Sequence, residues 1–269
     1  MTAMNHLRVG SVNVAFEQRG SGAPLVLLHG GVSDRREWRR QLEDLSDEFT
    51  VVAWDAPGCG QSTDPPEHFS LSDYARCLAE LIETLVLGRP HVAGLSFGGT
   101  LALELYRQRP DLPRTLILAS AYTGWAGSLP PEVVTERLQS VTRDSSGPPE
   151  EFAARWLPTL LTKGAPAALI DELRGIIIDF HPVGARTMAR AMARADLRDV
   201  LPKIDIPTLL LYGEADVRSA PTVAEELQAR IPDSTLIVLP QVGHQINMEA
   251  ADQFNSALRD FLHQHNEWR

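Results

Sequence analysis

The feature that most restricts the fold of this chain is the alternation of short, continuously apolar runs with longer helical stretches. The run at 24–29 (PLVLLH) ends in two glycines, and the run at 49–54 (FTVVAW) ends in an Asp-Ala-Pro-Gly turn. Short runs without alternating polar residues are typical of strands that are buried on both faces. The alternation therefore predicts a mostly parallel sheet with helices packed on both of its faces.

The remaining elements follow from the same patterns. Further strands are predicted at 11–18, 90–95, 114–120, 208–213 and 234–240, and helices at 71–87, 100–109 and 250–265. Ser70 or Ser72 is expected to cap the first of these helices, and Gly88 is expected to end it.

The stretch from 122 to 201 departs from the alternation. Strand-like runs fall away, and helical pieces rich in Ala and Arg follow one another, separated by Pro and Gly. A crossover between parallel strands needs only about a dozen residues. A segment this long therefore favours an inserted helical cap over ordinary crossover helices. We expect a core formed by 1–121 and 202–269 and a cap formed by 122–201.

Composition narrows the classes of partner and the location. The chain has 269 residues, 43% of them hydrophobic, and can bury a large core without disulfides or metals. Its formal net charge of -10 repels nucleic acid and anionic membranes, so neither is expected as a partner. The two cysteines form no Cys/His cluster, and residues 1–16 contain no apolar core of signal-peptide length. Without an apolar run long enough to span a bilayer, the expected location is the cytoplasm.

The strongest chemical signal is the G-x-S-x-G motif at 94–98 (GLSFG), centred on Ser96. It lies between a predicted strand and a predicted helix, where such a motif forms a sharp, strained turn that exposes the serine hydroxyl. Glycines two residues before and after the serine allow close approach of the backbone. The N–H groups at the start of the following helix favour developing negative charge. Ser96 is therefore the candidate nucleophile.

A serine hydroxyl is a weak nucleophile without a neighbouring base. Among eight histidines, His244 lies on a loop between the last predicted strand and the terminal helix. Ligand sites of such sheets lie at the carboxyl ends of the strands, and the chain order Ser, acid, His also fits. The imidazole needs an acidic acceptor to fix its tautomer. Asp216 and Glu214, which follow the strand at 208–213, both qualify.

A tetrahedral intermediate also needs two N–H donors directed at its oxygen. One is expected from Phe97, directly after the candidate nucleophile. The other is expected from the loop after the strand at 24–29, with Gly31 as the first choice and Val32 as the second.

Together these motifs resemble the α/β-hydrolase superfamily over essentially the whole chain. The resemblance includes the His-Gly-Gly loop with Trp38 downstream, the elbow at Ser96, and the Gly-Glu-Ala-Asp and Gly-His segments that end at Asp216 and His244. The segment 55–62 is similar to the family's D-x-R-G-x-G-x-S turn, with Pro57 in place of arginine. The resemblance implies a mostly parallel eight-stranded sheet with a helical cap. It also favours Asp216 over Glu214 as the triad acid.

The resemblance implies a serine hydrolase that acts on a small or medium carboxylic ester or lactone, without a metal or an organic cofactor. A C–C bond hydrolase, a perhydrolase or lyase with the same triad, and a ligand sensor on this fold stay open as alternatives. The partner is expected to be a small molecule, and the protein a monomer or a homodimer. Pocket-lining candidates are Trp125, Phe152, Trp156, Phe180 and Met188.

Overall fold

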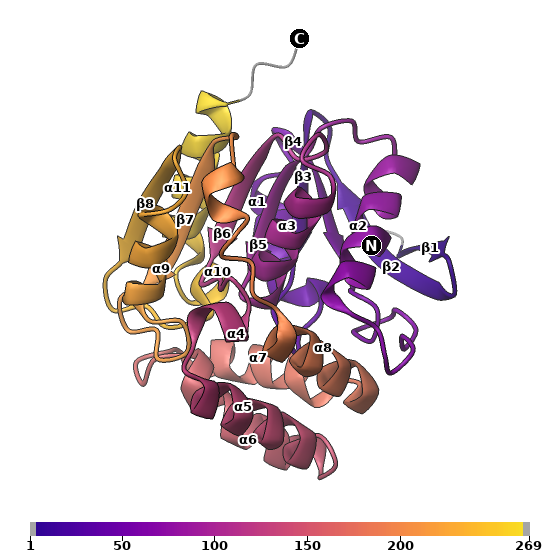
Figure 1. Cartoon of the computed structure of the whole chain (residues 1–269), viewed down its shortest axis with the longest axis vertical. Coiled ribbons are helices and arrows are strands. Elements are labelled where there is room, and N and C mark those ends of the chain that lie inside the picture. Colours follow the sequence, from indigo (N-terminus) through magenta and orange to yellow (C-terminus); the bar gives the residue numbers. More distant parts are fainter. Residues whose placement is uncertain (1–3, 266–269) are drawn as a thin grey trace.

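The computed structural model of this chain describes residues 4–265. These residues contain an eight-stranded sheet with the strand order β1-β2-β4-β3-β5-β6-β7-β8 (Figure 1). Strands β3 to β8 run parallel, and β2 runs antiparallel to both β1 and β4. The predicted mostly parallel sheet is confirmed. The strands are β1 (Asn5–Val9), β2 (Val12–Arg19), β3 (Ala23–Leu28), β4 (Phe49–Trp54), β5 (His91–Leu95), β6 (Thr115–Ala119), β7 (Thr208–Gly213) and β8 (Ser234–Leu239).

Among the described strands, β1 is the one that the sequence patterns missed; the short helices η1, α1, α9 and α10 were not predicted either. Strand β1 lies at the edge of the sheet, and its burial pattern is mostly exposed. Such a strand carries little of the apolar periodicity on which the prediction depends. Each of the other predicted strands begins and ends within one residue of an observed strand. The predicted outer limits of the core, Met1 and Arg269, lie outside the described residues.

Alternation of side chains along β3 explains why its sequence is apolar throughout. Val26 and Leu28 pack into the core on one face of the sheet, and Leu25 and Leu27 pack into the core on the other face. Successive side chains of a strand point to opposite faces, so a strand covered on both sides needs an apolar residue at every position.

Helices cover both faces of the sheet. Apolar side chains of α2, α3 and α9 join the first core, and those of α1 and α11 join the second. The helices are η1 (Arg35–Trp38), α1 (Arg39–Asp44), α2 (Leu71–Thr84), α3 (Phe97–Gln108), α4 (Trp125–Ser128), α5 (Pro131–Asp144), α6 (Pro149–Leu160), α7 (Ala167–Ile178), α8 (Pro182–Arg194), η2 (Leu201–Lys203), α9 (Pro221–Gln228), α10 (Ile246–Glu249) and α11 (Ala251–Gln264).

Helix α2 begins at one of the two serines proposed as its cap. The Ser70 side chain accepts a hydrogen bond from the Asp73 N–H, and the Asp73 carboxylate accepts one from the Ser70 N–H, so the two form a capping box. The helix ends at Thr84, three residues earlier than predicted. Val86 and Gly88 then both have positive φ, which is incompatible with continuing the helix.

Helices α4 to α8 all lie between β6 and β7 in the chain and gather beyond one end of the sheet (Figure 1). Ion pairs join α7 and the residue after it to the region of η1: Arg39 lies 2.9 Å from Glu172, and Arg36 lies 2.9 Å from Asp179. Helix α8 packs so closely on the 55–62 turn that a Cβ at Gly184 would overlap the Gly58 carbonyl.

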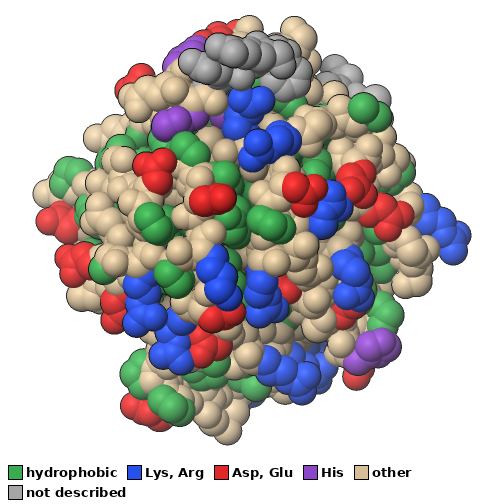
Figure 2. Space-filling model, turned by 45° about the horizontal axis from the view of Figure 1, so that its top comes forward, with side chains coloured by type: hydrophobic (Ala, Val, Ile, Leu, Met, Phe, Trp, Pro, Cys, Tyr) green, Lys and Arg blue, Asp and Glu red, His purple; other side chains and the backbone are tan. Residues whose placement is uncertain are grey.

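The surface carries both signs of charge. On the face shown in Figure 2, acidic and basic side chains are interspersed, and hydrophobic side chains are scattered among them. Within residues 4–265, each helix is too short or too polar to cross a membrane.

Replacement by alanine is expected to change the stability in opposite directions at two helical glycines, Gly184 and Gly175. At Gly184 a methyl group would overlap Gly58, so Gly184→Ala should lower the free energy of unfolding by about 2 kcal/mol. At Gly175 in α7 nothing lies within 4 Å of the added Cβ. There Gly175→Ala should raise the stability by about 1 kcal/mol or less, because alanine favours the helix. Urea unfolding of both variants measures this, and equal effects would contradict the close packing at Gly184.

Candidate active site

Ser96 lies in the turn between β5 and α3. Its backbone is in the left-handed region, with φ 52° and ψ −106°, although it is not a glycine. The turn is held on both sides, because the Ser96 N–H donates to the Ala119 carbonyl (2.8 Å) and the Ser96 carbonyl accepts from the Thr100 N–H (3.1 Å). A non-glycine residue in this region is strained, and such strain persists only where the surroundings impose it.

The glycines around Ser96 explain how the strain is imposed. A Cβ at Gly94 would overlap the backbone of Gly98, and a Cβ at Gly98 would overlap the carbonyl of Leu28 in β3. At Gly99 an added Cβ would lie 2.5 Å from the Ala121 Cβ. Helix α3 therefore reaches its position against β3 and β5 only because these positions lack side chains.

His244 and Asp216 come together from two loops at the carboxyl ends of β8 and β7. The His244 Nδ1 lies 2.8 Å from Asp216 Oδ2, and both residues are buried. The other oxygen of Asp216, Oδ1, accepts hydrogen bonds from the backbone N–H groups of Arg218 (2.8 Å) and Ser219 (2.9 Å). Glu214, the competing acid, is exposed and accepts from the Gln241 N–H instead.

The surroundings of Asp216 keep its carboxyl ionised. Burial opposes ionisation, but the neighbouring His244 and the hydrogen bonds from His244, Ser219 and Arg218 outweigh it, and the pKa of Asp216 lies below its ordinary value. A buried carboxylate with acceptor oxygens fixed in this way can orient an imidazole and stabilise its protonated form.

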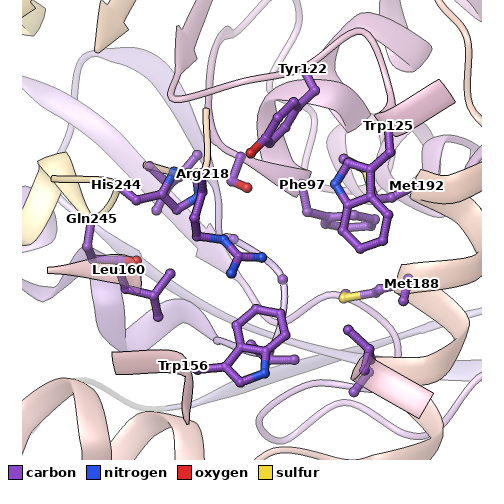
Figure 3. A pocket seen from close by; sticks show the side chains of 18 residues that line it. Phe97, Tyr122, Trp125, Trp156, Leu160, Met188, Met192, Arg218, His244 and Gln245 are labelled. Atoms are coloured by element: carbon purple, nitrogen blue, oxygen red, sulfur yellow. The ribbon is translucent and has the colours of Figure 1, made fainter. Parts of the chain in front are cut away.

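Ser96 and His244 line the same pocket, which holds about 570 Å³ of empty space including its open mouth. The walls are mostly apolar, and they come from the edge of the sheet and from the helices packed beyond that edge (Figure 3). A pocket of this size fits a small organic ligand. The lining residues are Gly30, Gly31, Val32, Leu95, Ser96, Phe97, Tyr122, Trp125, Val141, Trp156, Leu160, Ala185, Met188, Ala189, Met192, Arg218, His244 and Gln245.

The two expected oxyanion donors also lie at this pocket. Helix α3 begins at Phe97, so the Phe97 N–H belongs to the first turn and has no carbonyl partner within the helix. Gly31 lies beside it, since a Cβ at Gly31 would be 4.0 Å from the Phe97 Cβ. Val32, the second choice, also lines the pocket and has a positive φ of 56°.

Pocket-lining residues were predicted only in part. Trp125, Trp156 and Met188 line the pocket, as proposed. Phe152 and Phe180 do not; they stack behind Trp156, with Phe152 at 5.1 Å from Trp156 and 4.3 Å from Phe180 between ring centroids. Sequence reasoning missed Tyr122 and Arg218, both of which face the pocket. The sequence offered one signal that could have pointed to Arg218 as a pocket residue, which is its position two residues after Asp216.

Two other side chains with reactive groups, those of Cys59 and His181, make contacts that hold the fold together. Cys59 is buried against Met188, and burial raises the pKa of its thiol well above the ordinary value, so it is a poor nucleophile. The His181 ring contacts the Asp64 carboxylate (2.7 Å) and the Gly60 carbonyl (3.1 Å), which links α8 to the loop after β4. Among residues 4–265, no group of three or more His, Cys, Asp or Glu side chains is arranged to hold a metal ion.

A buried carboxyl, Glu37, connects the two loops of the site from behind. Its Oε1 accepts from the Gly30 N–H (3.0 Å), and its Oε2 accepts from the Gln245 side chain (2.9 Å). Burial raises the pKa of Glu37 to about 7, against the smaller opposite effects of these two hydrogen bonds. Glu37 thus fixes the loop that carries Gly31 relative to the loop that carries His244.

The comparisons with known proteins agree on one fold. The family model of the alpha/beta hydrolase fold matches residues 23–251. The chain is 30% identical to the (E)-2-((N-methylformamido)methylene)succinate hydrolase of Acinetobacter baylyi, and the match covers 92% of each protein. It is also 30% identical to the acetyltransferase component of the acetoin cleaving system of Pseudomonas putida, but there it covers 93% of this chain and spans 66% of the longer relative.

One solved structure matches this chain over nearly its whole length. A thermophilic esterase from Thermogutta terrifontis, with malate bound, superposes with a TM-score of 0.90 at 30% sequence identity. The match covers 99% of both chains.

The raised pKa of Glu37 predicts a pH-dependent stability. Between about pH 4.5 and 7 the folded state holds a proton that the unfolded state has lost, so stability falls as pH rises through this window. Glu37→Gln removes the titration, and its stability relative to the parent protein should rise by about 3 kcal/mol from pH 5 to pH 8.

Urea unfolding at several pH values measures this difference. Glu43→Gln serves as the control, because the Glu43 side chain is 43% exposed and lies in the same region. A stability difference between Glu37→Gln and the parent that stays constant with pH would contradict the prediction.

Proposed function

The chain belongs to the alpha/beta hydrolase fold family, and on that premise we propose that it is a serine hydrolase that cleaves a small or medium carboxylic ester or lactone. The observation that carries the proposal is that a strained, half-buried Ser96 lines the same pocket as His244, whose Nδ1 lies 2.8 Å from the buried Asp216 carboxylate. The similarity to an esterase along the full length of both chains supports the choice of ester chemistry.

In the proposed first step, Ser96 Oγ attacks the substrate carbonyl carbon while His244 accepts the hydroxyl proton. Asp216 holds the Nδ1–H of the imidazole, so Nε2 is the free nitrogen and acts as the base. The negative charge on the carbonyl oxygen is stabilised by the N–H groups of Gly31 and Phe97. The dipole of α3, which begins at Phe97, acts in the same direction.

Collapse of the tetrahedral intermediate breaks the bond to the leaving oxygen. His244 returns its proton to that oxygen, so an ester releases an alcohol and a lactone opens its ring, and the acyl group stays on Ser96. Water then attacks the acyl-enzyme, with His244 as the base again, and releases the carboxylic acid. The reaction balances without an oxidant, a metal or an organic cofactor.

Residues 122–201 are proposed to act as a cap over this chemistry. Side chains of α5, α6 and α8 form walls of the pocket, so this segment selects the substrate, whereas the loops at the sheet edge supply the reacting groups. The C–C bond hydrolase, perhydrolase or lyase, and sensor alternatives, the cytoplasmic location and the monomer or homodimer state stay predictions.

Ser96→Ala should abolish ester turnover without unfolding the protein, because alanine removes only the attacking oxygen. The measurement is steady-state hydrolysis of a panel of esters and lactones, with unfolding by urea as the check on folding. Turnover by Ser96→Ala at the parent rate would refute the role of Ser96.

Asp216→Asn should lower kcat by roughly 10⁴-fold. The asparagine oxygen would keep the hydrogen bonds from the Arg218 and Ser219 N–H groups, so its NH₂ group would face His244 and force the wrong tautomer. Glu214→Gln is the matched control, because Glu214 is exposed and bound to Gln241, and it should leave kcat unchanged. A large loss in the control and a small one in Asp216→Asn would reverse the assignment of the acid.

A further inference from the structure

Arg218 places a positive charge inside the pocket that the mechanism above does not use. Its side chain extends between His244 and Trp156 toward the middle of the pocket (Figure 3). The guanidinium carbon lies 4.3 Å from the centre of the Trp156 ring, and Nη1 donates to Thr159 Oγ1 at 3.0 Å. These contacts fix the direction of the side chain but leave Nε and Nη2 without an acceptor among residues 4–265.

No carboxylate within the described part of the chain lies within ion-pair distance of this guanidinium. Asp216 is two residues away in sequence, but its carboxylate is bound to His244 and to backbone N–H groups. Burial, the largest effect, lowers the pKa of Arg218 below its ordinary value; Tyr122 and Asp216 act in the opposite direction, and the charge of Arg137 adds to the lowering. A partly buried positive charge in a mostly apolar pocket is therefore left without a carboxylate partner among the described residues, which is unfavourable.

The second arginine, Arg137, supports Arg218 and does not neutralise it. Its Nη2 donates to the Arg218 carbonyl (2.9 Å) and its Nη1 donates to the Tyr122 hydroxyl (3.0 Å). A second positive charge therefore lies close behind Arg218, in a chain whose formal net charge is -10. The charge of Arg218 faces the pocket, whereas the charge of Asp216 is directed to His244, so an anionic ligand in the pocket would meet a positive group.

We propose that Arg218 binds a carboxylate of the substrate, so that the preferred substrate is an ester or lactone that carries a second, free carboxylate group. This inference rests on the proposed function, since it names the substrate class of the same site. The planar fork of Arg218 matches the two oxygens of a carboxylate. A singly charged group fits this site, because Arg218 lines the pocket and Arg137, which is bound to the Tyr122 hydroxyl and the Arg218 carbonyl, does not.

An isosteric pair of substrates tests the proposal: monomethyl succinate, which carries a carboxylate, and methyl succinamate, which carries a neutral amide of the same shape. The parent protein should prefer the anion in kcat/KM. Arg218→Gln should lower kcat/KM for the anion by roughly 30-fold or more, mainly through KM, and change that for the amide only slightly. Arg218→Lys should recover part of the preference, because it keeps the charge and loses the fork.

Arg174→Gln is the control for loss of charge. Arg174 lies on α7, its side chain is 54% exposed, and it lies 3.9 Å from Asp171, away from the pocket. The Arg174→Gln variant should keep the preference of the parent protein for monomethyl succinate over methyl succinamate. Equal losses for both substrates in Arg218→Gln would overturn the proposal, because they would mean that Arg218 only holds the loop of Asp216. A parent protein that prefers the amide would overturn it as well.

A binding measurement separates this proposal from the proposed function. Calorimetry on Ser96→Ala should detect binding of monomethyl succinate in preference to methyl succinamate, and Arg218→Gln in that background should remove the preference. Equal binding of both, or binding of neither at millimolar concentrations, would overturn the role of Arg218. Selective binding together with full turnover by Ser96→Ala would instead overturn the nucleophile and leave the carboxylate site intact.

Discussion

The structure around the candidate site depends on one close backbone approach, that of α3 against β3 and β5. A side chain at Gly98 would overlap the Leu28 carbonyl, and one at Gly94 would overlap Gly98 itself. Because the helix lies this close, the chain passes from β5 to α3 through the single residue Ser96, which takes a left-handed conformation. The same approach sets the first N–H groups of α3 at the pocket and brings Phe97 beside Gly31.

The turn after β7 combines two electrostatic tasks within three residues. Asp216 is buried and held by backbone N–H groups, so that its charge faces His244. Arg218 sends its side chain the other way, into the pocket and onto Trp156. Separating the two charges within one turn keeps the acid available to the imidazole, because the arginine does not take it as an ion-pair partner.

The sheet and the three proposed catalytic residues could be predicted from the sequence because their signals are local. A strand covered on both faces is apolar throughout, and the residues after strand ends meet at one edge of a parallel sheet. The edge strand β1 has no such signal, since most of its side chains are exposed. Tyr122 and Arg218 could not be assigned, because the direction of a loop side chain depends on helices distant in sequence, here α5 and α6.

The two hydrogen bonds of Arg137 also have a mechanical meaning. Its side chain fastens α5 both to the Tyr122 hydroxyl, on the segment after β6, and to the main chain at Arg218, on the segment after β7. If α5 swings outward with these bonds unbroken, it has to drag the Asp216 turn with it. The position of α5 and the alignment of the imidazole are in this way mechanically linked through a single side chain.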